Sequence, residues 1–327
     1  MPSNPDFSWL NGQIVPWDNC VLHARSQAAF WGANVFEGVR AYWSEETGQL
    51  SLFRLQEHLT RLRASMKCVG MRIAYSDAEL IEATLELLRA NQVREDTHIV
   101  IAAYFGTGPN FDPMQHIEET GVHITALPLG RSPRFETGAS ACISSWRRIS
   151  DDAMPPRIKT GANYHNSRLA QHEATRNGYD TAFFLNHRGT LAEAPGSCVM
   201  MVRDGELCTP PGTSGVLEGI TVQSISQLAQ EVLGIGTHKR EIDRTELYLA
   251  DEVFIAGTLS EIQPITTVDR QAVGTGAPGP LTRQLQDLYE VAVRGTADAY
   301  GWNLPVYVPS QGRGVISKGE AIDAAVV

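Results

Sequence analysis

The sequence lacks the features that define several classes of protein. Its five cysteines are odd in number, scattered and never in a Cys-x-x-Cys pair, so neither a disulfide framework nor a zinc site is suggested, and we expect no metal. No run of 18 apolar residues occurs, so we predict no membrane span. Residues 1–6 lack a basic stretch followed by an apolar one, and we therefore expect a cytoplasmic protein with reduced thiols.

Positive charge is also scarce. The net charge is -10, which argues against a general nucleic-acid binder, since such proteins present a basic patch or stripe. No Gly-x-Gly-x-x-Gly motif opens a helix after a strand, which disfavours a Rossmann dehydrogenase. With 43% apolar and 20% charged residues, the composition is that of a globular protein. We expect its partners to be small molecules rather than nucleic acid or membrane.

The chain is long enough for two domains. At 327 residues it exceeds the length at which a single hydrophobic core usually stops growing. Residues 128–138 contain two prolines, two glycines and two arginines, which is typical of a connection between domains. We therefore predict a small N-terminal α/β domain over 1–127, an interdomain loop over 128–138 and a larger, cofactor-binding domain over 139–327.

Helical and strand-like segments alternate through both predicted domains. Apolar positions at helical spacing, cap signals such as Ser76 to Glu79, and β-branched runs bounded by glycine mark these elements. The fold class is therefore α/β (α+β). We predict strands at 50–53, 98–105, 122–127, 141–146, 181–185, 198–202 and 252–256, and helices at 55–69, 76–88, 164–176, 221–233 and 281–300.

Two residues combine ionisable chemistry with small neighbours. Lys159 precedes Thr-Gly-Ala-Asn, a stretch that can present an amine in a cavity without crowding, and lysine forms Schiff bases with pyridoxal phosphate (PLP). Most lysines, however, are solvated surface charges. Glu193 lies among small residues before an apolar strand, where a buried carboxylate needs a cationic partner such as a protonated pyridine nitrogen. A surface turn is the alternative interpretation for Glu193.

Three further patterns suit a phosphate group. Gly219-Ile220-Thr221 begins a predicted helix, and free backbone N–H groups at such a terminus bind anions. Gly257-Thr258 follows a predicted strand, and Arg61 lies on the first predicted helix, where it can add a bidentate contact. A plain helix cap and a solvated arginine are the structural alternatives.

In order and spacing, these patterns resemble the class IV, PLP-dependent aminotransferases, particularly the branched-chain amino acid aminotransferases. The segment 35–42, Val-Phe-Glu-Gly-Val-Arg-Ala-Tyr, is similar to the family's N-terminal signature. The motifs around Lys159, Glu193, Thr221 and Thr258 follow in family order, and the resemblance covers about residues 7–310. It implies PLP fold type IV, two α/β domains with the cofactor in the cleft between them, and a homodimer or higher homo-oligomer.

The resemblance also implies a role for each matching residue. Lys159 is the expected catalytic residue, as Schiff-base lysine and proton shuttle, while Tyr164 would bond the ring hydroxyl and Glu193 the pyridine nitrogen. The cofactor residues would be Arg61, Lys159, Tyr164, Glu193, Leu217, Gly219, Ile220, Thr221, Gly257 and Thr258. The substrate pocket would include Trp31, Phe36, Gly38, Arg40, His98, Val100 and Leu259.

The chain departs from this family on one predicted strand. Where branched-chain enzymes commonly carry Tyr-x-Arg, it has His98 and Val100, which removes a charge and five hydrogen-bond donors. We expect ping-pong transfer of an amino group from a branched-chain or other hydrophobic donor to a 2-oxo acid. The alternatives are an (R)-selective primary amine transaminase on the same scaffold, a PLP lyase of aminodeoxychorismate type, and a non-catalytic binding protein.

Overall fold

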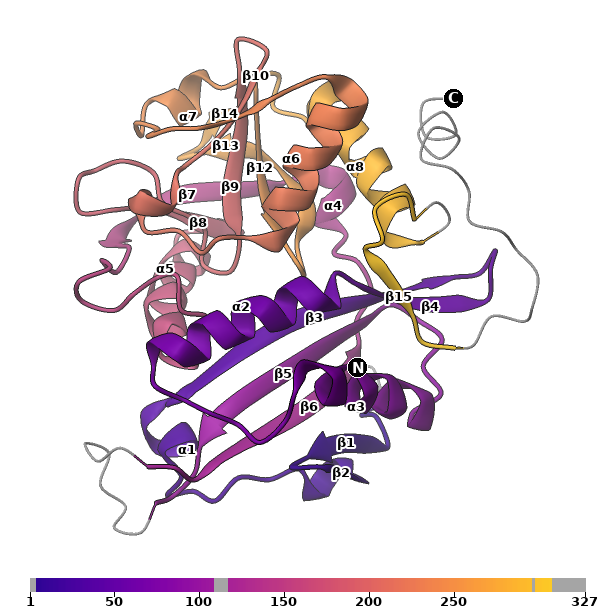
Figure 1. Ribbon diagram of the computed structural model, residues 1–327. Coiled ribbons are helices and arrows are strands. Elements are labelled where there is room, and N and C mark those ends of the chain that lie inside the picture. The colour runs from indigo at the N-terminus through magenta and orange to yellow at the C-terminus, as the bar shows by residue number, and fades with distance from the viewer. Residues whose placement is uncertain (1–3, 109–116, 296–297, 308–327) are drawn as a thin grey trace. The chain divides into compact units, whose positions relative to one another are not determined.

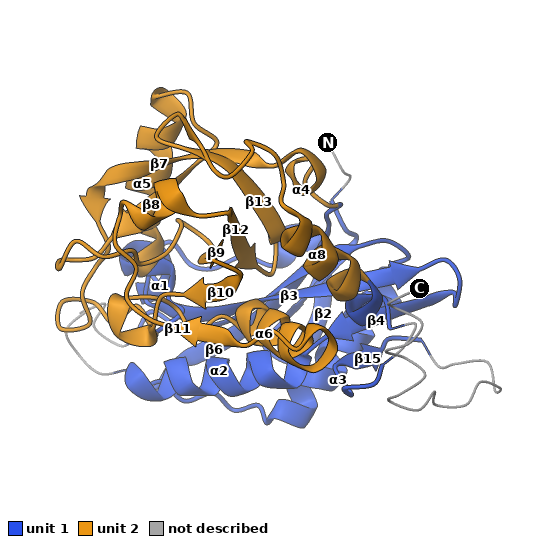
Figure 2. Cartoon of the chain, turned by 90° about the horizontal axis from the view of Figure 1, so that it is seen from above, with its two compact units in different colours: residues 1–130, 158–162, 291–327 blue, residues 131–157, 163–290 orange. Residues whose placement is uncertain are grey.

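Two compact units make up the chain in the computed structural model, which describes residues 4–108, 117–295 and 298–307 (Figure 1). Unit 1 comprises residues 1–130, 158–162 and 291–327, and unit 2 comprises 131–157 and 163–290 (Figure 2). Each unit is built on one large β-sheet with helices packed against it, so the protein is of the mixed α/β class.

Unit 1 contains a seven-stranded sheet in the order β15-β4-β3-β5-β6-β1-β2, in which every neighbouring pair is antiparallel. A short 3-10 turn covers Trp17–Asn19. The strands are β1 Phe7–Leu10, β2 Gln13–Pro16, β3 Asn34–Ser44, β4 Gln49–Phe53, β5 Thr97–Phe105, β6 Thr120–Pro128 and β15 Asn303–Pro305, and the helices are α1 Gln27–Trp31, α2 Leu55–Cys68 and α3 Asp77–Ala90.

The two faces of this sheet differ because side chains alternate along each strand. Helices α2 and α3 cover one face (Figure 1). Val39 and Ile99 of the central strands form a core there with Leu62 and Leu87 of these helices. On β3 and β5, the residues that alternate with these buried ones along each strand lie on the opposite face. That face carries Phe36, Gly38, Arg40, His98 and Val100.

Unit 2 contains an eight-stranded sheet with the path β11-β10-β9-β12-β13-β7-β8, to which β14 adds beside β13. The pairs β13–β7, β7–β8 and β10–β11 are parallel, and α5 packs against β7 and β8 while α6 packs against β12. The strands are β7 Ala139–Arg147, β8 Thr181–Leu185, β9 Cys198–Arg203, β10 Glu206–Thr209, β11 Thr237–Lys239, β12 Glu252–Gly257, β13 Glu261–Val268 and β14 Gln271–Ala272. The helices are α4 Arg134–Thr137, α5 Tyr164–Arg176, α6 Ile220–Leu233, α7 Glu246–Leu249 and α8 Pro280–Val293, with 3-10 turns at Gly161–Asn163 and Gly212–Ser214. The end of α8, from Val291, and the start of the first turn, Gly161 and Ala162, are assigned to unit 1.

Most predicted elements are present, and two differences have clear causes. The helix predicted over 281–300 ends at Val293, because the chain turns at Gly295, whose φ of 66° is left-handed. The long strands β3 and β13 were not predicted, nor were the short elements β1, β2, β10, β11, β14, β15, α1, α4 and α7. The alternation of β3 is masked by Glu37, which lies on the buried face although it is charged.

The division into units differs from the predicted ranges of 1–127 and 139–327. Residues 158–162 and 291–327 belong to unit 1. Ile158 and Val306 pack into the core of that unit, and the Arg294 guanidinium pairs with both carboxylate oxygens of Asp96. These two segments belong to unit 1 because they contact residues of that unit that are distant in sequence. Local sequence patterns do not predict such contacts.

Within the described ranges, no helix is both long enough and apolar enough to cross a bilayer. The same residues contain no group of three or more His, Cys, Asp and Glu side chains that could hold a metal ion.

Candidate active site

Lys159 is fixed in unit 1 through its backbone. Its carbonyl accepts a hydrogen bond of 2.9 Å from the Phe36 N–H on β3, and its own N–H donates to Ser65 Oγ on α2 at 3.2 Å. The next residue, Thr160, forms a β-bridge with Val35. The Lys159 amine lies 5.0 Å from the centre of the Phe36 ring. Strand β3 and helix α2 thus determine where this amine is presented.

Lys159 also differs from the other lysines in its environment. The sequence contains four lysines, of which Lys318 lies outside the described residues. Lys67 and Lys239 are exposed, whereas Lys159 is half-buried. Among the lysines that the structure describes, Lys159 alone is partly shielded from solvent, so it is not a plain solvated surface charge.

Arg61 forms a buried ion pair with Glu37, a residue that the sequence interpretation did not assign to the site. Its Nε and a terminal nitrogen donate to the two Glu37 oxygens at 2.8 and 2.7 Å. His58 Nδ1 lies 2.7 Å from Glu37 Oε2. Burial opposes the ionisation of Glu37, but the hydrogen bonds from Arg61 and His58, together with the charge of Arg61, outweigh it and lower the pKa of Glu37 to about 2. Burial lowers the pKa of His58, so near pH 7 a neutral imidazole donates to the carboxylate.

The sheet face of unit 1 that lies opposite α2 and α3 brings together five of the residues predicted for the substrate pocket, Phe36 among them. Gly38 pairs with Val100, and Arg40 pairs with His98. A Cβ at Gly38 would lie 2.9 Å from His98 Nε2, so the imidazole occupies the space above the glycine. Burial, then the positive charges of Arg40 and Lys159, lower the pKa of His98 to about 4. His98 is therefore uncharged at neutral pH.

Arg40 does not present its charge to solvent. Its side chain is 1% exposed, one terminal nitrogen donates to the Leu129 carbonyl at 3.0 Å, and the guanidinium lies over the Tyr42 ring. Trp31, in contrast, is 51% exposed at the end of α1 and stacks edge-on with Phe30. Phe36 lies between these two extremes, half-buried next to the Lys159 amine.

In unit 2, Glu193 is a buried carboxylate with donors on both oxygens. An Arg148 terminal nitrogen lies 2.7 Å from Oε1, and the Leu217 N–H donates to Oε2 at 2.8 Å. The cation that accompanies Glu193 within the chain is thus Arg148, which sequence reasoning missed because the pair is 45 positions apart (193 - 148). The bond to Leu217 brings two predicted cofactor residues together.

Tyr164 begins helix α5 and is half-buried. The preceding Asn163 is buried and donates to the Pro155 carbonyl at 3.0 Å. This bond fixes the chain just before the helix, so the position of Tyr164 depends on the turn that precedes it.

Helix α6 begins at Ile220 with Gly219 as its N-cap, a residue with no side chain to cap the first turn. Ile220 and Thr221 are both buried. A 14-residue helix presents backbone N–H groups and the positive end of its dipole at this terminus, which suits a phosphate. The other predicted phosphate residues, Gly257 and Thr258, lie at the end of β12, while Leu259 after them is 45% exposed.

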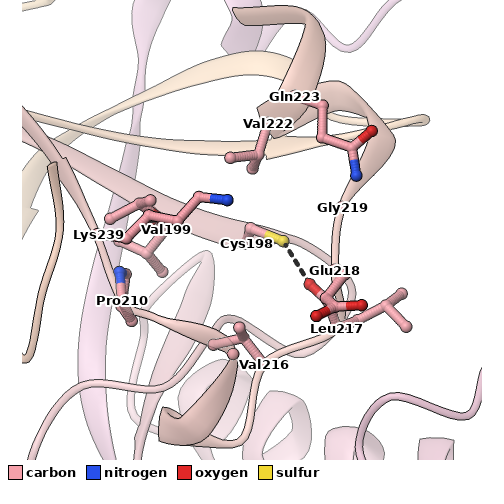
Figure 3. A pocket seen from close by; sticks show the side chains of 12 residues that line it. Cys198, Val199, Pro210, Val216, Leu217, Glu218, Gly219, Val222, Gln223 and Lys239 are labelled. Atoms are coloured by element: carbon pink, nitrogen blue, oxygen red, sulfur yellow. Dashed lines mark hydrogen bonds between the residues drawn. The ribbon is translucent and has the colours of Figure 1, made fainter. Parts of the chain in front are cut away.

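Cys198 supports the turn that leads into α6. Its thiol donates to the Leu217 carbonyl at 3.3 Å, and a Cβ at Gly219 would lie 2.8 Å from the sulfur. Figure 3 shows the sulfur pointing toward the turn. A small cavity of about 70 Å³ lies beside it, lined also by Val222 and Lys239. Glycine is therefore required at 219 by the close approach of Cys198.

Comparison with known proteins identifies the family. A model of the class IV aminotransferases matches residues 34–268. The probable branched-chain-amino-acid aminotransferase of Aquifex aeolicus is 38% identical over 303 residues, which are 92% of this chain and 97% of that protein. The branched-chain-amino-acid aminotransferase of Escherichia coli K12 is 38% identical over 91% of this chain and 96% of its own.

Solved structures agree. The PLP form of the branched-chain amino acid aminotransferase from Thermobaculum terrenum has a TM-score of 0.87 and 44% identity, and the match covers 93% of this chain and 99% of that one. The Escherichia coli enzyme has a TM-score of 0.88 at 36% identity. The chain therefore belongs to the class IV aminotransferases. It is a PLP-dependent aminotransferase.

The depressed pKa of His98 predicts a pH dependence of stability. The unfolded chain binds a proton below its ordinary pKa of 6.5, whereas the folded chain does so only near pH 4. Protonation of His98 therefore favours the unfolded chain between these values: the free energy of unfolding is highest above pH 6.5 and decreases as the pH falls toward 4. Between pH 7.5 and 5.0 the wild type should lose about 2 kcal/mol more unfolding free energy than His98→Gln in denaturant titrations. His165→Gln, at an exposed position, is the control and should behave as wild type. Equal pH slopes for wild type and His98→Gln would contradict this assignment.

The contact between Gly219 and Cys198 predicts a double-mutant effect. Gly219→Ala should weaken PLP binding about tenfold in a spectroscopic titration, because the new Cβ displaces the start of α6 or the Cys198 thiol. Combining it with Cys198→Ala removes the sulfur and should recover most of that affinity. If the losses of PLP affinity in the two single variants simply add in the double variant, the two residues are not coupled. Contact with Cys198 would then not be the reason for glycine at 219.

Proposed function

We propose that this aminotransferase moves the amino group of a branched-chain or other hydrophobic amino acid to a 2-oxo acid, through Lys159. The observation that carries the proposal is the similarity, over more than nine tenths of the chain, to proteins named for branched-chain amino acids, combined with one half-buried lysine fixed between β3 and α2.

The described residues fit PLP in charge and chemistry. For the phosphate we propose Arg61, the uncapped start of α6 at Gly219, Ile220 and Thr221, and the Gly257-Thr258 turn. For the pyridine nitrogen we propose the ionised Glu193, and for the ring hydroxyl Tyr164. Leu217, whose N–H is bonded to Glu193, would pack against the ring. These roles follow from the family resemblance, and the geometry within each unit supports them.

When bound, PLP supplies an electron sink that makes a proton on the donor's α-carbon labile. Lys159 would hold the cofactor through its amine and would also be the base for the proton on the donor's α-carbon. Glu193 would keep the ring nitrogen charged. Arg61 would orient the phosphate from a guanidinium that Glu37 already holds in place. Because the first 2-oxo acid would leave before the acceptor binds, we expect ping-pong kinetics.

A hydrophobic donor is favoured by the face of unit 1 beside Lys159. Phe36 and Val100 are apolar, His98 is neutral above about pH 4, and the Arg40 charge is buried. An acidic donor side chain would lose hydration there, and none of these residues offers it an exposed positive charge. Trp31 of unit 1 and Leu259 of unit 2, both strongly exposed, are the remaining residues proposed to contact substrate.

The same face supports a second candidate, an (R)-selective primary amine transaminase. At the position where the family commonly has arginine, the residue that pairs with Gly38 is Val100. An amine that carries no carboxylate needs no guanidinium, and an apolar neighbour lowers its desolvation penalty.

We further propose that the enzyme is a cytoplasmic homodimer or higher homo-oligomer. Val21, Phe30 and Trp31 of unit 1 are 67%, 53% and 51% exposed, and apolar side chains of this size are commonly covered by a partner. Light scattering coupled to gel filtration gives the subunit number.

Replacing Lys159 tests the proposed chemistry. Lys159→Ala should lose the visible absorbance of the cofactor Schiff base and all measurable transamination, because alanine supplies neither the amine nor the base. Lys67→Ala, at an exposed lysine of α2, should retain both. Turnover by Lys159→Ala at a rate near that of the control would refute the proposal.

Replacing Val100 tests substrate choice. Val100→Arg should improve 2-oxoglutarate relative to an (R)-configured primary amine, measured as a ratio of kcat/KM, by about tenfold to a hundredfold, since a charge-assisted hydrogen bond is worth about 1.5–3 kcal/mol. Val100→Leu, which adds bulk without charge, should leave the ratio near that of the wild type. An equal shift in both variants would mean that charge at this position does not select the acceptor. Wild-type enzyme with no turnover of any amine lacking a carboxylate would eliminate the second candidate.

A further inference from the structure

Arg148 is a buried arginine that none of the proposed roles uses. It follows β7, and its N–H donates to the Leu185 carbonyl of β8 at 2.9 Å. Its side chain is only 5% exposed. Besides the 2.7 Å contact with Glu193, the guanidinium donates to the Gly215 carbonyl at 3.2 Å and to Asn166 Oδ1 at 3.4 Å. All of these partners belong to unit 2.

Glu193 is held just as firmly on its other side. Its Oε2 accepts from the Leu217 N–H at 2.8 Å, and its backbone carbonyl accepts from Phe184 N–H on β8 at 2.9 Å. The carboxylate therefore has a fixed orientation set by a charged donor on one oxygen and a backbone donor on the other. Its side chain is 8% exposed, so solvent contributes little to its charge state.

The charge of Arg148 has a chemical consequence. A proton shared between a carboxylate and a pyridine nitrogen resides on the group with the greater proton affinity. A guanidinium 2.7 Å from the carboxylate, at a site largely shielded from water, favours the carboxylate anion over the neutral acid. The shared proton is thereby kept on the nitrogen.

We infer that Arg148 is a positioning residue for the reaction: it holds Glu193 ionised and oriented, so that the proton remains on the pyridine nitrogen of the cofactor. The inference rests on the proposed pairing of Glu193 with that nitrogen. Arg148 acts only through Glu193, and its contacts with Gly215 and Asn166 fix the guanidinium in the geometry that this requires.

The test uses holoenzyme reconstituted with PLP that carries nitrogen-15 in the ring, because the chemical shift of this nucleus reports its protonation directly. Arg148→Gln keeps a hydrogen-bond donor but removes the charge, and its ring nitrogen should shift toward the neutral pyridine value. Arg148→Lys keeps the charge but loses the planar fork, and its resonance should stay near that of the wild type. Arg203→Met, which removes an arginine paired with Glu246 elsewhere in unit 2, is the control and should leave the resonance unchanged.

Rates should follow the same order. Proton abstraction from the donor in single turnovers should fall about tenfold or more in Arg148→Gln and less in Arg148→Lys, since each 1.36 kcal/mol in the barrier changes a rate tenfold. If Arg148→Gln slows the reaction but leaves the nitrogen resonance at the wild-type position, Arg148 is only a structural residue and the inference is wrong.

Two further variants separate this inference from the proposed function. Glu193→Gln alone should shift the nitrogen resonance toward the neutral value, and an unchanged resonance would refute the role of Glu193 itself. Removing the charge of Arg148 alone leaves a buried carboxylate without its cation, which can prevent folding. The double variant Arg148→Gln, Glu193→Gln avoids this, and its resonance should equal that of Glu193→Gln. An additional shift in the double variant would show that Arg148 does not act through Glu193.

Discussion

The placement of five residues, 158–162, is the constraint on which the rest of the site depends. Their neighbours on both sides in sequence belong to unit 2, yet Lys159 and Thr160 are hydrogen-bonded to β3 of unit 1. These bonds fix the backbone from which the amine projects, and the Phe36 ring lies next to that amine. Because the backbone at Lys159 is fixed in this way, the amine can reach fewer positions than that of a lysine on an exposed helix.

Each unit then adds a buried carboxylate held by an arginine. In unit 1, Glu37 binds the Arg61 guanidinium through both oxygens, and in unit 2, Arg148 contacts Glu193. In the first pair the carboxylate positions the arginine, and in the second the arginine acts on the carboxylate. Glu37 orients an arginine that is proposed to face phosphate, while Arg148 sets the charge of a carboxylate that is proposed to face the ring nitrogen. Buried ion pairs contribute little net stability, so geometry and charge state are the properties that these pairs provide.

Local signals in the sequence predicted much of the fold. The helix at 164–176 and the strand at 181–185 coincide with α5 and β8, because a terminal Asn-Gly and the short apolar run Thr-Ala-Phe-Phe-Leu act over a few positions. What sequence reasoning missed depends on contacts between distant positions. Thr160 bonds to the Asn34 carbonyl 126 residues away, which places the lysine segment in unit 1, and neither Glu37 nor Arg148 is marked as a partner by its neighbours. The motifs around Lys159 and Glu193 were identified by family resemblance, and their roles stay predictions.

The most direct test of the proposed amino-group transfer is a half-reaction in the absence of an acceptor. Purified holoenzyme mixed with excess L-leucine should release one molecule of 4-methyl-2-oxopentanoate per bound PLP and then stop, with loss of the visible absorbance, until a 2-oxo acid is added. Restoration of the absorbance by that acid completes the ping-pong cycle. Continuous release of product without an acceptor, or no release from leucine or any other hydrophobic amino acid, would contradict the account.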